Sequence, residues 1–404
     1  MSTILVVNSG SSSLKYQLID AEDEDVLASG LIERIGEDAG LATHLRPSGS
    51  HTREVSVPDH AAALAVMRAA FGEHGPNLAD HPPIAVGHRV VHGGSQYTEA
   101  TVVTTRVKAD IADLASLAPL HNPANLQGIE AAERLFADIP HVVVFDTAFH
   151  LTLPPAAFTY AIEAELAERQ RIRRYGFHGT SHAFVSRAAA EFLGRPRDEL
   201  KQIVLHLGNG ASACAVDGGR SVETSMGMTP LEGLVMGTRS GDLDPAVLVY
   251  LHRTTGMDFD ELEDFLNRRS GLLGLSGHND MRDVHAAAAA GDQAAQLAFD
   301  VYLHRLKHYI GGYVAQLGRL DALVFTAGVG ENSPEVRAEA VEGLEVLGIR
   351  LDPARNAAPS HDPRLISTDD SAVAVLVIPT NEELEIARQT LAMVRPRRGR
   401  TEAR

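Results

Sequence analysis

The chain has 404 residues, a formal net charge of −17 at pH 7 and a single cysteine, Cys214. Its length suffices for two domains with hydrophobic cores of their own, and its strong negative charge argues against nucleic acid or an anionic membrane surface as a partner. Because one cysteine forms no internal disulfide, and because we recognise neither a signal peptide nor a membrane-spanning stretch, we expect a cytoplasmic protein.

The first predicted element is a β-hairpin at the N-terminus. Residues 4–20 read ILVVNSGSSSLKYQLID, in which two apolar runs flank a turn of asparagine, serine and glycine. The turn is followed by Lys15, and lysine is a common partner of phosphate groups. A further strand is expected up to Leu31, and the polar segment 36–58 contains strand-like pieces.

Three helices are predicted in the remainder of the first half, because apolar residues recur there at helical spacing. The third helix follows the rigid turn APLHNP, in which Asn122 is expected to cap the helix and Pro123 to lie in its first turn. The predicted helices cover residues 59–70, 106–117 and 123–136.

Two strands of the first half bring charged residues to a candidate site. The strand at 84–91 carries Arg89, and the strand at 141–145 is followed directly by Asp146. Open α/β sheets place functional groups at the carboxyl ends of their strands. Asp146 is therefore expected at a catalytic position, with Arg89 as a candidate partner for an anion.

The second half begins with another strand, glycine turn and strand. Residues 203–216 read IVLHLGNGASACAV, with Gly208, Asn209 and Gly210 forming the turn. The pattern Gly208-x-Gly210-x-x-Ala213 also resembles a dinucleotide fingerprint, but that motif needs a helix opening at the glycines and an acidic residue about twenty positions later. A hairpin turn of small residues exposes backbone N–H groups to a polyphosphate, although an ordinary tight turn is the alternative.

A third glycine-rich turn lies near the C-terminus. Residues 323–332 read LVFTAGVGEN, and a helix is expected to open at Ser333-Pro334. Three such turns predict a nucleotide held between two similar halves. The irregular segment 224–244 holds Arg239, and long irregular segments in a compact domain are usually functional or mobile. The other predicted elements are helices at 175–193, 245–253, 258–268, 284–317, 334–347 and 382–393 and strands at 322–325 and 373–378.

The last helix has a recognisable start. If Thr380 is its N-cap, Glu383 occupies the capping-box position three residues later, which leaves Glu382 to face the site. The tail from Pro396 is polar and basic and is expected to be disordered. Cys214 is expected to be a small core residue.

Two segments of the chain resemble a known family. No Walker A motif or protein-kinase signature occurs, but NSGSSSLK at 8–15 and HLGNG at 206–210 resemble the two signature segments of the acetate kinase family. This family belongs to the superfamily of acetate and sugar kinases, heat-shock-70 proteins and actin. The resemblance covers nearly the whole chain.

The resemblance implies a specific fold. We expect an α/β, two-domain actin-like (ribonuclease H-like) fold with a duplicated βββαβαβα core and a nucleotide in the interdomain cleft. The N-terminal actin-like domain is expected to comprise residues 1–148 and the C-terminal helix 382–395. Residues 149–381 are expected to form the C-terminal actin-like domain with the nucleotide-binding loops, and residues 396–404 a disordered tail.

The resemblance also implies an activity. It implies a homodimer that transfers a phosphoryl group reversibly from ATP to acetate, giving ADP and acetyl phosphate, with Mg²⁺ or Mn²⁺ as cofactor. Propionate kinase or another short-chain carboxylate kinase is the alternative within the family, since one methylene changes binding only modestly. A sugar kinase would need polar groups for several hydroxyls, and a non-enzymatic actin-like or chaperone-like switch would not explain Arg89, His178 and Arg239.

The resemblance assigns roles to residues that match the family's motifs. The catalytic set is Arg89, Asp146, His178 and Arg239. The substrate set is Arg89, Val91, Leu120, His121, Phe177 and Pro230, of which the apolar members surround the acetate methyl. The nucleotide set is Lys15, His206, Leu207, Gly208, Asn209, Gly210, Asp280, Met281, Arg282, Gly328, Val329, Gly330, Glu331 and Asn332. The magnesium positions are Asn8 and Glu382.

The chemistry of phosphoryl transfer explains this combination of residues. The reaction requires positioning and positive charge around a loose, in-line transition state, which Arg89, Arg239 and His178 can supply together with Mg²⁺. Acetate arrives ionised and needs no general base, so we expect Asp146 to orient the metal, its waters or a cationic neighbour instead of carrying a proton. The pair His178 and His182 has a spacing that would suit zinc, but no third ligand accompanies it.

Overall fold

The computed structural model describes residues 2–395 and separates them into two compact units. Unit 1 contains the residues up to Ala148 together with those from Asn381 onward, and unit 2 contains Phe149–Thr380. The tail predicted from Pro396 lies outside the described residues. No helix within residues 2–395 combines the length and apolarity needed to cross a bilayer.

Unit 1 is built on an eight-stranded sheet with the order β5-β4-β3-β2-β1-β6-β8-β7. Strands β1 to β5 are consecutive antiparallel neighbours, whereas β6 runs parallel to β1 and β8 runs parallel to β6. The strands are β1 (Thr3–Ser9), β2 (Ser13–Asp20), β3 (Val26–Glu33), β4 (Gly40–Arg46), β5 (Gly49–Val55), β6 (Pro83–Val90), β7 (Thr101–Val102) and β8 (His141–Phe145).

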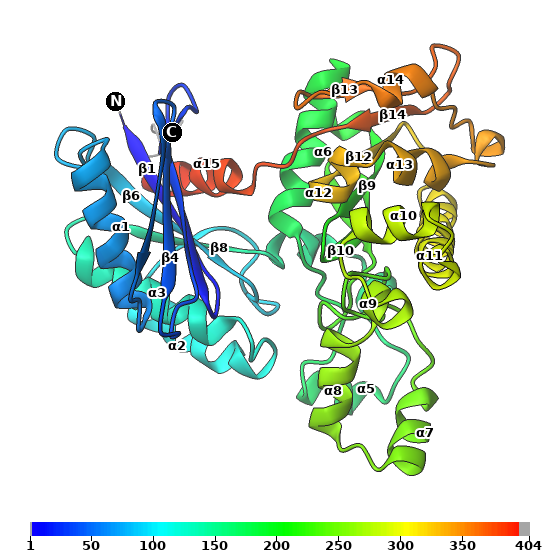
Figure 1. The fold of residues 1–404 in the computed structure, drawn as a ribbon, viewed down its shortest axis with the longest axis horizontal. Coiled ribbons are helices and arrows are strands. Elements are labelled where there is room, and N and C mark those ends of the chain that lie inside the picture. Colours follow the sequence, from blue (N-terminus) through cyan, green and yellow to red (C-terminus); the bar gives the residue numbers. More distant parts are fainter. Residues whose placement is uncertain (1, 396–404) are drawn as a thin grey trace, which may run out of the picture. The chain divides into compact units, whose positions relative to one another are not determined.

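Helices cover both faces of this sheet. Leu5 and Val7 of β1 pack in one hydrophobic cluster with residues of α1 and α3, whereas Ile4 and Val6 pack in another with α15. Because side chains alternate between the faces of a strand, β1 must be apolar at every one of these positions. Figure 1 shows α15 alongside β1 and β6. The helices are α1 (His60–His74), α2 (Thr105–Asp113), α3 (Asn122–Leu135) and α15 (Glu382–Val394).

Unit 2 repeats the strand order of unit 1. Its six-stranded sheet has the order β11-β10-β9-β12-β14-β13, in which β9 to β11 are antiparallel and β12 and β14 are parallel to β9. The series β3-β2-β1-β6-β8 in unit 1 therefore corresponds to β11-β10-β9-β12-β14, as expected for a duplicated core. The strands are β9 (Lys201–Leu207), β10 (Ala211–Asp217), β11 (Arg220–Thr224), β12 (Ala322–Thr326), β13 (Arg364–Leu365) and β14 (Ala374–Val377).

The helices of unit 2 surround its sheet and carry the loops of the candidate site. Cys214 of strand β10 is fully buried, as predicted. The helices are α4 (Pro155–Phe158), α5 (Ala164–Arg169), α6 (Gly179–Leu193), α7 (Ala246–Thr255), α8 (Phe259–Arg268), α9 (Gly271–Ser276), α10 (Met281–Ala289), α11 (Gln293–Leu317), α12 (Ala327–Asn332), α13 (Pro334–Val341) and α14 (Pro353–Ala357).

Two local predictions were wrong. The helix predicted over 284–317 is interrupted between α10 and α11, because Gly291 has a φ of 93° and the Asp292 side chain caps α11 by accepting from two backbone N–H groups. Asn122 does not cap α3, whose N-cap position is His121. The buried amide of Asn122 instead bonds the backbone of His92 in both directions, at 3.1 and 3.0 Å.

Candidate active site

The parallel pairing of two neighbouring strands brings Arg89 and Asp146 together in unit 1. Arg89 of β6 lies opposite Val144 of β8, so that Asp146 follows at the end of β8. The Arg89 Nη2 donates to Asp146 Oδ2 at 2.8 Å, and Asp146 is only 1% exposed. The first residue of α15 completes the cluster, since Glu382 Oε2 lies 3.7 Å from Arg89 Nε.

Burial and the neighbouring charges both shift the pKa values of Arg89 and Glu382. Burial alone lowers the pKa of Arg89, but the carboxylates of Asp146 and Glu382 outweigh it and raise that pKa above its usual value. Burial raises the pKa of Glu382 to about 7, although Arg89 opposes the shift, and the nearby Asp146 carboxylate adds to it. The cluster therefore holds one permanent cation beside a carboxyl group that resists ionisation.

Arg89 retains an unused donor. Its Nε is buried, and within residues 2–395 it has no hydrogen-bond partner. A buried N–H group without an acceptor is costly, by about 1–3 kcal/mol. An anionic oxygen bound beside Arg89 would satisfy it.

The start of α15 differs from the prediction. Its N-cap is Asn381, which accepts from the Leu384 N–H at 3.0 Å, and not Thr380. Glu383 takes no part in a capping box, because its Oε1 lies 2.6 Å from Lys15 Nζ. Lys15, predicted to contact the nucleotide, is half exposed and belongs to unit 1.

The predicted magnesium positions provide oxygen donors of the kind that Mg²⁺ prefers. Asn8 near the end of β1 and Glu382 at the start of α15 both offer oxygen ligands, and α15 packs against β1. Within residues 2–395, no group of three or more His, Cys, Asp or Glu side chains could hold a metal by itself. Asn8 and Glu382 together fit Mg²⁺, which commonly binds through one or two protein oxygens with waters and substrate phosphates.

The raised pKa of Glu382 predicts how stability depends on pH. Between the usual value of 4.5 and about 7, the folded protein retains a proton that the unfolded chain has released. The free energy of unfolding in EDTA should therefore fall as pH rises through this window, by at most about 3 kcal/mol from this group. Urea unfolding of wild type and Glu382→Gln at about pH 5 and about pH 8 measures this contribution. Identical pH dependence in the two proteins would contradict it.

In unit 2, the turn between β9 and β10 lies beside His178 and Arg239. A Cβ atom placed on Gly210 would come within 3.6 Å of both Arg239 Nη1 and His178 Nε2. His178 precedes α6 with a left-handed backbone, φ 56° and ψ 24°, which is uncommon for a residue other than glycine. The imidazoles of His178 and His206 are stacked with centroids 4.2 Å apart.

The irregular segment that carries Arg239 is held by partly buried hydrogen bonds. Arg239 Nη1 donates to the Pro230 carbonyl at 3.1 Å, and burial lowers the pKa of Arg239. Upstream, Arg174 donates from Nη1 to three successive carbonyls of residues 224–226 and from Nη2 to Glu232 at 2.5 Å. Arg174 could not be recognised from the sequence, because an arginine in a loop carries no pattern of its own.

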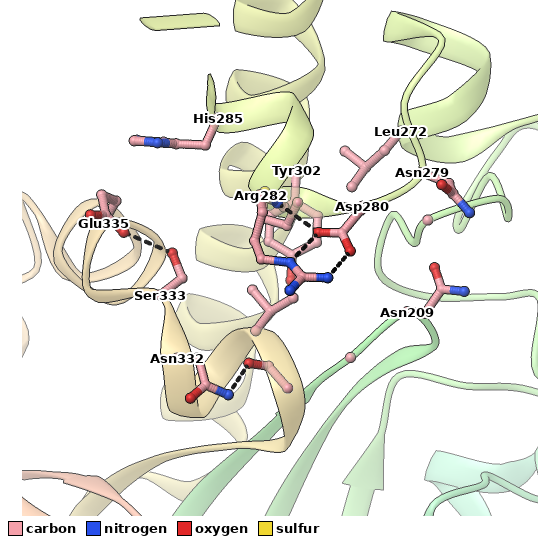
Figure 2. A pocket seen from close by; sticks show the side chains of 15 residues that line it. Asn209, Leu272, Asn279, Asp280, Arg282, His285, Tyr302, Asn332, Ser333 and Glu335 are labelled. Atoms are coloured by element: carbon pink, nitrogen blue, oxygen red, sulfur yellow. Dashed lines mark hydrogen bonds and ion pairs between the residues drawn. The ribbon is translucent and has the colours of Figure 1, made fainter. Parts of the chain in front are cut away.

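A pocket of about 660 Å³ lies next to the same turn in unit 2 (Figure 2). Asp280 caps α10 and pairs with Arg282 through Nε at 3.0 Å and Nη2 at 2.6 Å, and this hydrogen bonding lowers the pKa of Asp280 to about 2. The lining residues are Gly208, Asn209, Gly237, Leu272, Asn279, Asp280, Met281, Arg282, His285, Tyr302, Gly328, Val329, Asn332, Ser333 and Glu335.

The pocket gathers most of the loops that were predicted to bind the nucleotide. Residues of all three unit 2 loops line it, but His206, Leu207, Gly210, Gly330 and Glu331 do not. Helix α11 contributes Tyr302. The predicted open turn at 328–332 is part of the short helix α12, and Ser333 caps α13 as expected.

One buried arginine stabilises helix α12 by hydrogen bonds to its backbone. Arg337 of α13 is 1% exposed, and its Nη1 donates to the carbonyls of Gly330 and Glu331 at 3.0 and 2.9 Å. Its Nε and Nη2 donate to the side chain and the carbonyl of Asn356, both at 2.8 Å. This residue fixes the end of α12, and sequence patterns did not single it out.

The residues predicted to surround the methyl group lie in different units. Val91 and Phe177 are buried, whereas Leu120 is 51% exposed. Val91, Leu120 and the half-buried His121 belong to unit 1, and Phe177 and Pro230 belong to unit 2.

Comparison with known proteins identifies the family. The model of the acetokinase family matches residues 3–388. An acetate kinase of Leifsonia xyli subsp. xyli (strain CTCB07) is 68% identical over 394 residues, which cover 98% of this chain and 99% of that protein. The chain belongs to the acetokinase family. The family predicted from the two signature segments is thereby confirmed.

Solved structures confirm the acetokinase fold. The crystal structure of Porphyromonas gingivalis acetate kinase matches with a TM-score of 0.93 and 40% identity, covering 97% of this chain and 100% of that chain. A propionate kinase from Francisella tularensis subsp. tularensis SCHU S4 matches with a TM-score of 0.91, at the same identity and coverage. The predicted α/β actin-like fold is correct, and the chain is a phosphotransferase that acts on a carboxyl group.

Proposed function

We propose that this chain phosphorylates acetate with ATP, giving acetyl phosphate and ADP in a reversible reaction that requires Mg²⁺. The observation that carries the proposal is Arg89, a half-buried guanidinium that pairs with Asp146 and whose buried Nε–H group has no hydrogen-bond partner within residues 2–395. Such a group suits an anionic oxygen. The identity of 68% to an acetate kinase over almost the full length supports acetate as the acceptor.

Unit 1 supplies the acceptor side of the reaction. Arg89 binds the carboxylate or the transferred phosphoryl group, and Asp146 orients Arg89 through their 2.8 Å hydrogen bond. Because acetate is already ionised, no step of the transfer requires Asp146 to remove a proton. Asn8 and Glu382 would hold Mg²⁺, which would offset the negative charge of the nucleotide phosphates.

Unit 2 supplies the donor side. The pocket beside Gly208 and Asn209 binds the nucleotide, and the nucleotide loops at 206–210, 280–282 and 328–332 hold its phosphates together with Lys15 of unit 1. His178 and Arg239, which both lie near Gly210, stabilise the charge on the transferred group. The proposed reaction requires these residues and Arg89 to act on the same phosphoryl group.

A second candidate acceptor is propionate, because a propionate kinase matches this chain as closely in identity as a solved acetate kinase does. We propose that Val91, Leu120, Phe177 and Pro230 enclose the methyl group and set the acid length. Their bulk favours acetate over longer acids, although one methylene is worth only about 1–3 kcal/mol in a hydrophobic pocket.

We further propose that the protein is a cytoplasmic homodimer. Helix α7 (Ala246–Thr255) has no buried residue, although it carries Val249 and Tyr250, which are 49% and 67% exposed. Phe259 at the start of α8 is 81% exposed. An exposed apolar face of this kind is typical of a protein interface, and a second copy of the chain would cover it.

Trapping of the acyl phosphate tests the proposed function. Purified protein is incubated with ATP, Mg²⁺, hydroxylamine and either acetate, propionate or butyrate at several concentrations. We expect hydroxamate formation with kcat/KM highest for acetate. A higher value for propionate would replace the acetate assignment, and no hydroxamate from any acid would contradict the kinase function.

A further inference from the structure

A serine hydroxyl lies between the half-buried imidazole of His178 and the buried imidazole of His182, next to the proposed site of transfer. Ser212 of β10 is fully buried and pairs with His206 of β9. Its Oγ lies 2.8 Å from His178 Nδ1 and 2.8 Å from His182 Nε2. The two histidines stand one helical turn apart at the start of α6, so both rings reach the same hydroxyl.

The single proton of this hydroxyl links the two rings. Within residues 2–395, the two ring nitrogens are the partners of the Ser212 side chain. A serine hydroxyl donates one hydrogen bond, so it cannot serve two nitrogens that both lack a proton. When Ser212 donates to one imidazole, the other must donate to Ser212. The tautomer of His178 is therefore coupled to that of His182.

The second ring nitrogen of His178, Nε2, determines which of the two hydrogen-bond arrangements suits the reaction. Its Nε2 lies on the side of Gly210 where Arg239 Nη1 also lies. A nitrogen that stabilises an anionic phosphoryl group there must carry a proton. In the neutral ring, Nδ1 is then an acceptor, so Ser212 must donate to it and His182 Nε2 must donate to Ser212.

We propose that Ser212 and His182 are positioning residues that hold His178 in the tautomer protonated at Nε2, ready to donate to the transferred phosphoryl group. The inference rests on the proposed function, in which His178 acts on that group. Ser212 and His182 do not touch the substrate and act through the orientation and protonation of His178. In the same way, hydrogen-bond partners fix the tautomer of metal-bound or catalytic histidines in other proteins.

Other serines in the same cluster do not create this coupling. Ser181 lies 2.8 Å from His206 Nδ1, but its second partner is the hydroxyl of Thr380, which can donate or accept. Ser221 lies 2.8 Å from His150 Nδ1 and 3.3 Å from Cys214 Sγ. Ser221 is as fully buried as Ser212 and does not contact His178, so it provides a matched control.

Nitrogen NMR of the imidazoles tests the proposal directly. The full-length protein is labelled with ¹⁵N-histidine, and the His178 signals are assigned by their loss in His178→Asn. We expect a protonated Nε2 and an acceptor Nδ1 in the wild type. In Ser212→Ala, the signals of His178 should shift toward a mixture of tautomers, and kcat should fall about tenfold while both KM values change less than about twofold.

The variants distinguish positioning from packing. Ser212→Thr keeps the hydroxyl and should restore the tautomer and most of kcat, and Ser221→Ala should leave the His178 signals as in the wild type. His182→Gln keeps a donor N–H toward Ser212 and should preserve the tautomer, whereas His182→Leu should not. If Ser212→Ala does not fold, the comparison of His182→Gln with His182→Leu tests the proposal instead.

Two results would overturn the inference. One is an unchanged tautomer of His178 in Ser212→Ala and in His182→Leu, and the other is a wild-type His178 whose proton resides on Nδ1. Failure of the proposed function has a different signature. In that case no acid gives an acyl phosphate, while the imidazole spectra still report whether Ser212 sets the tautomer.

Discussion

Replacing Arg89 by alanine is expected to lower kcat/KM at least about 10³-fold, because an arginine that stabilises a transferred phosphoryl group contributes at least that much. The variant also leaves the buried Asp146 carboxylate without its 2.8 Å partner. Arg89→Lys restores the charge but not the planar pair of donors, so most of the loss should remain. Steady-state rates of ADP formation with acetate measure the effect.

A matched control separates this effect from the general loss of a charge. Arg53 of unit 1 is exposed and pairs with Glu73 at 3.1 Å, on strand β5 (Gly49–Val55). Arg53→Ala should retain kcat/KM within about twofold, since exposed ion pairs contribute little. An Arg89→Ala enzyme within about tenfold of wild type would contradict the role given to Arg89.

Replacing Arg337 by methionine is expected to lower the free energy of unfolding by about 3–5 kcal/mol. The four hydrogen bonds of Arg337 satisfy the carbonyls of Gly330 and Glu331 and both oxygens of Asn356. Methionine has a similar length but leaves these buried acceptors without donors. Because Gly330 and Glu331 belong to helix α12, whose residues Gly328, Val329 and Asn332 line the pocket proposed to bind the nucleotide, KM for ATP should also rise.

Chemical unfolding and ATP titration of the same preparation test both effects. Arg350 is a suitable control, because it also lies in unit 2, is 53% exposed and pairs with an exposed Asp370. Arg350→Met should change the free energy of unfolding by less than about 0.5 kcal/mol. Equal effects of the two substitutions would show that burial of Arg337 does not support α12.

Much of the fold follows from local patterns in the sequence. The strand 141–145 and the hairpins around residues 10–12 and 208–210 have the predicted bounds or nearly so, because alternating apolar runs flank small turn residues. The break between α10 and α11 was missed because alanine propensity on both sides conceals it. A single glycine at positive φ and one aspartate cap outweigh that propensity.

The site was less predictable than the fold. Strand order explains why Arg89 and Asp146 could be expected together, since each marks one of two neighbouring parallel strands. The pairing of Lys15 with Glu383 could not be predicted, because it joins residues at opposite ends of the chain. Arg337 and Tyr302 lie on helices whose sequences suggest only surface or core, so their burial beside the loops proposed to bind the nucleotide depends on tertiary packing.

In the proposed reaction, the acetate carboxylate attacks the γ-phosphorus of ATP. Incubation with ¹⁸O-labelled acetate, ATP and Mg²⁺, followed by ³¹P NMR of the acetyl phosphate, tests it most directly. We predict a ³¹P signal displaced by one ¹⁸O bonded to phosphorus, because an oxygen of the carboxylate becomes the bridging atom. ADP formed at an equal rate without acetate, or acetyl phosphate with no ¹⁸O on phosphorus, would contradict the account.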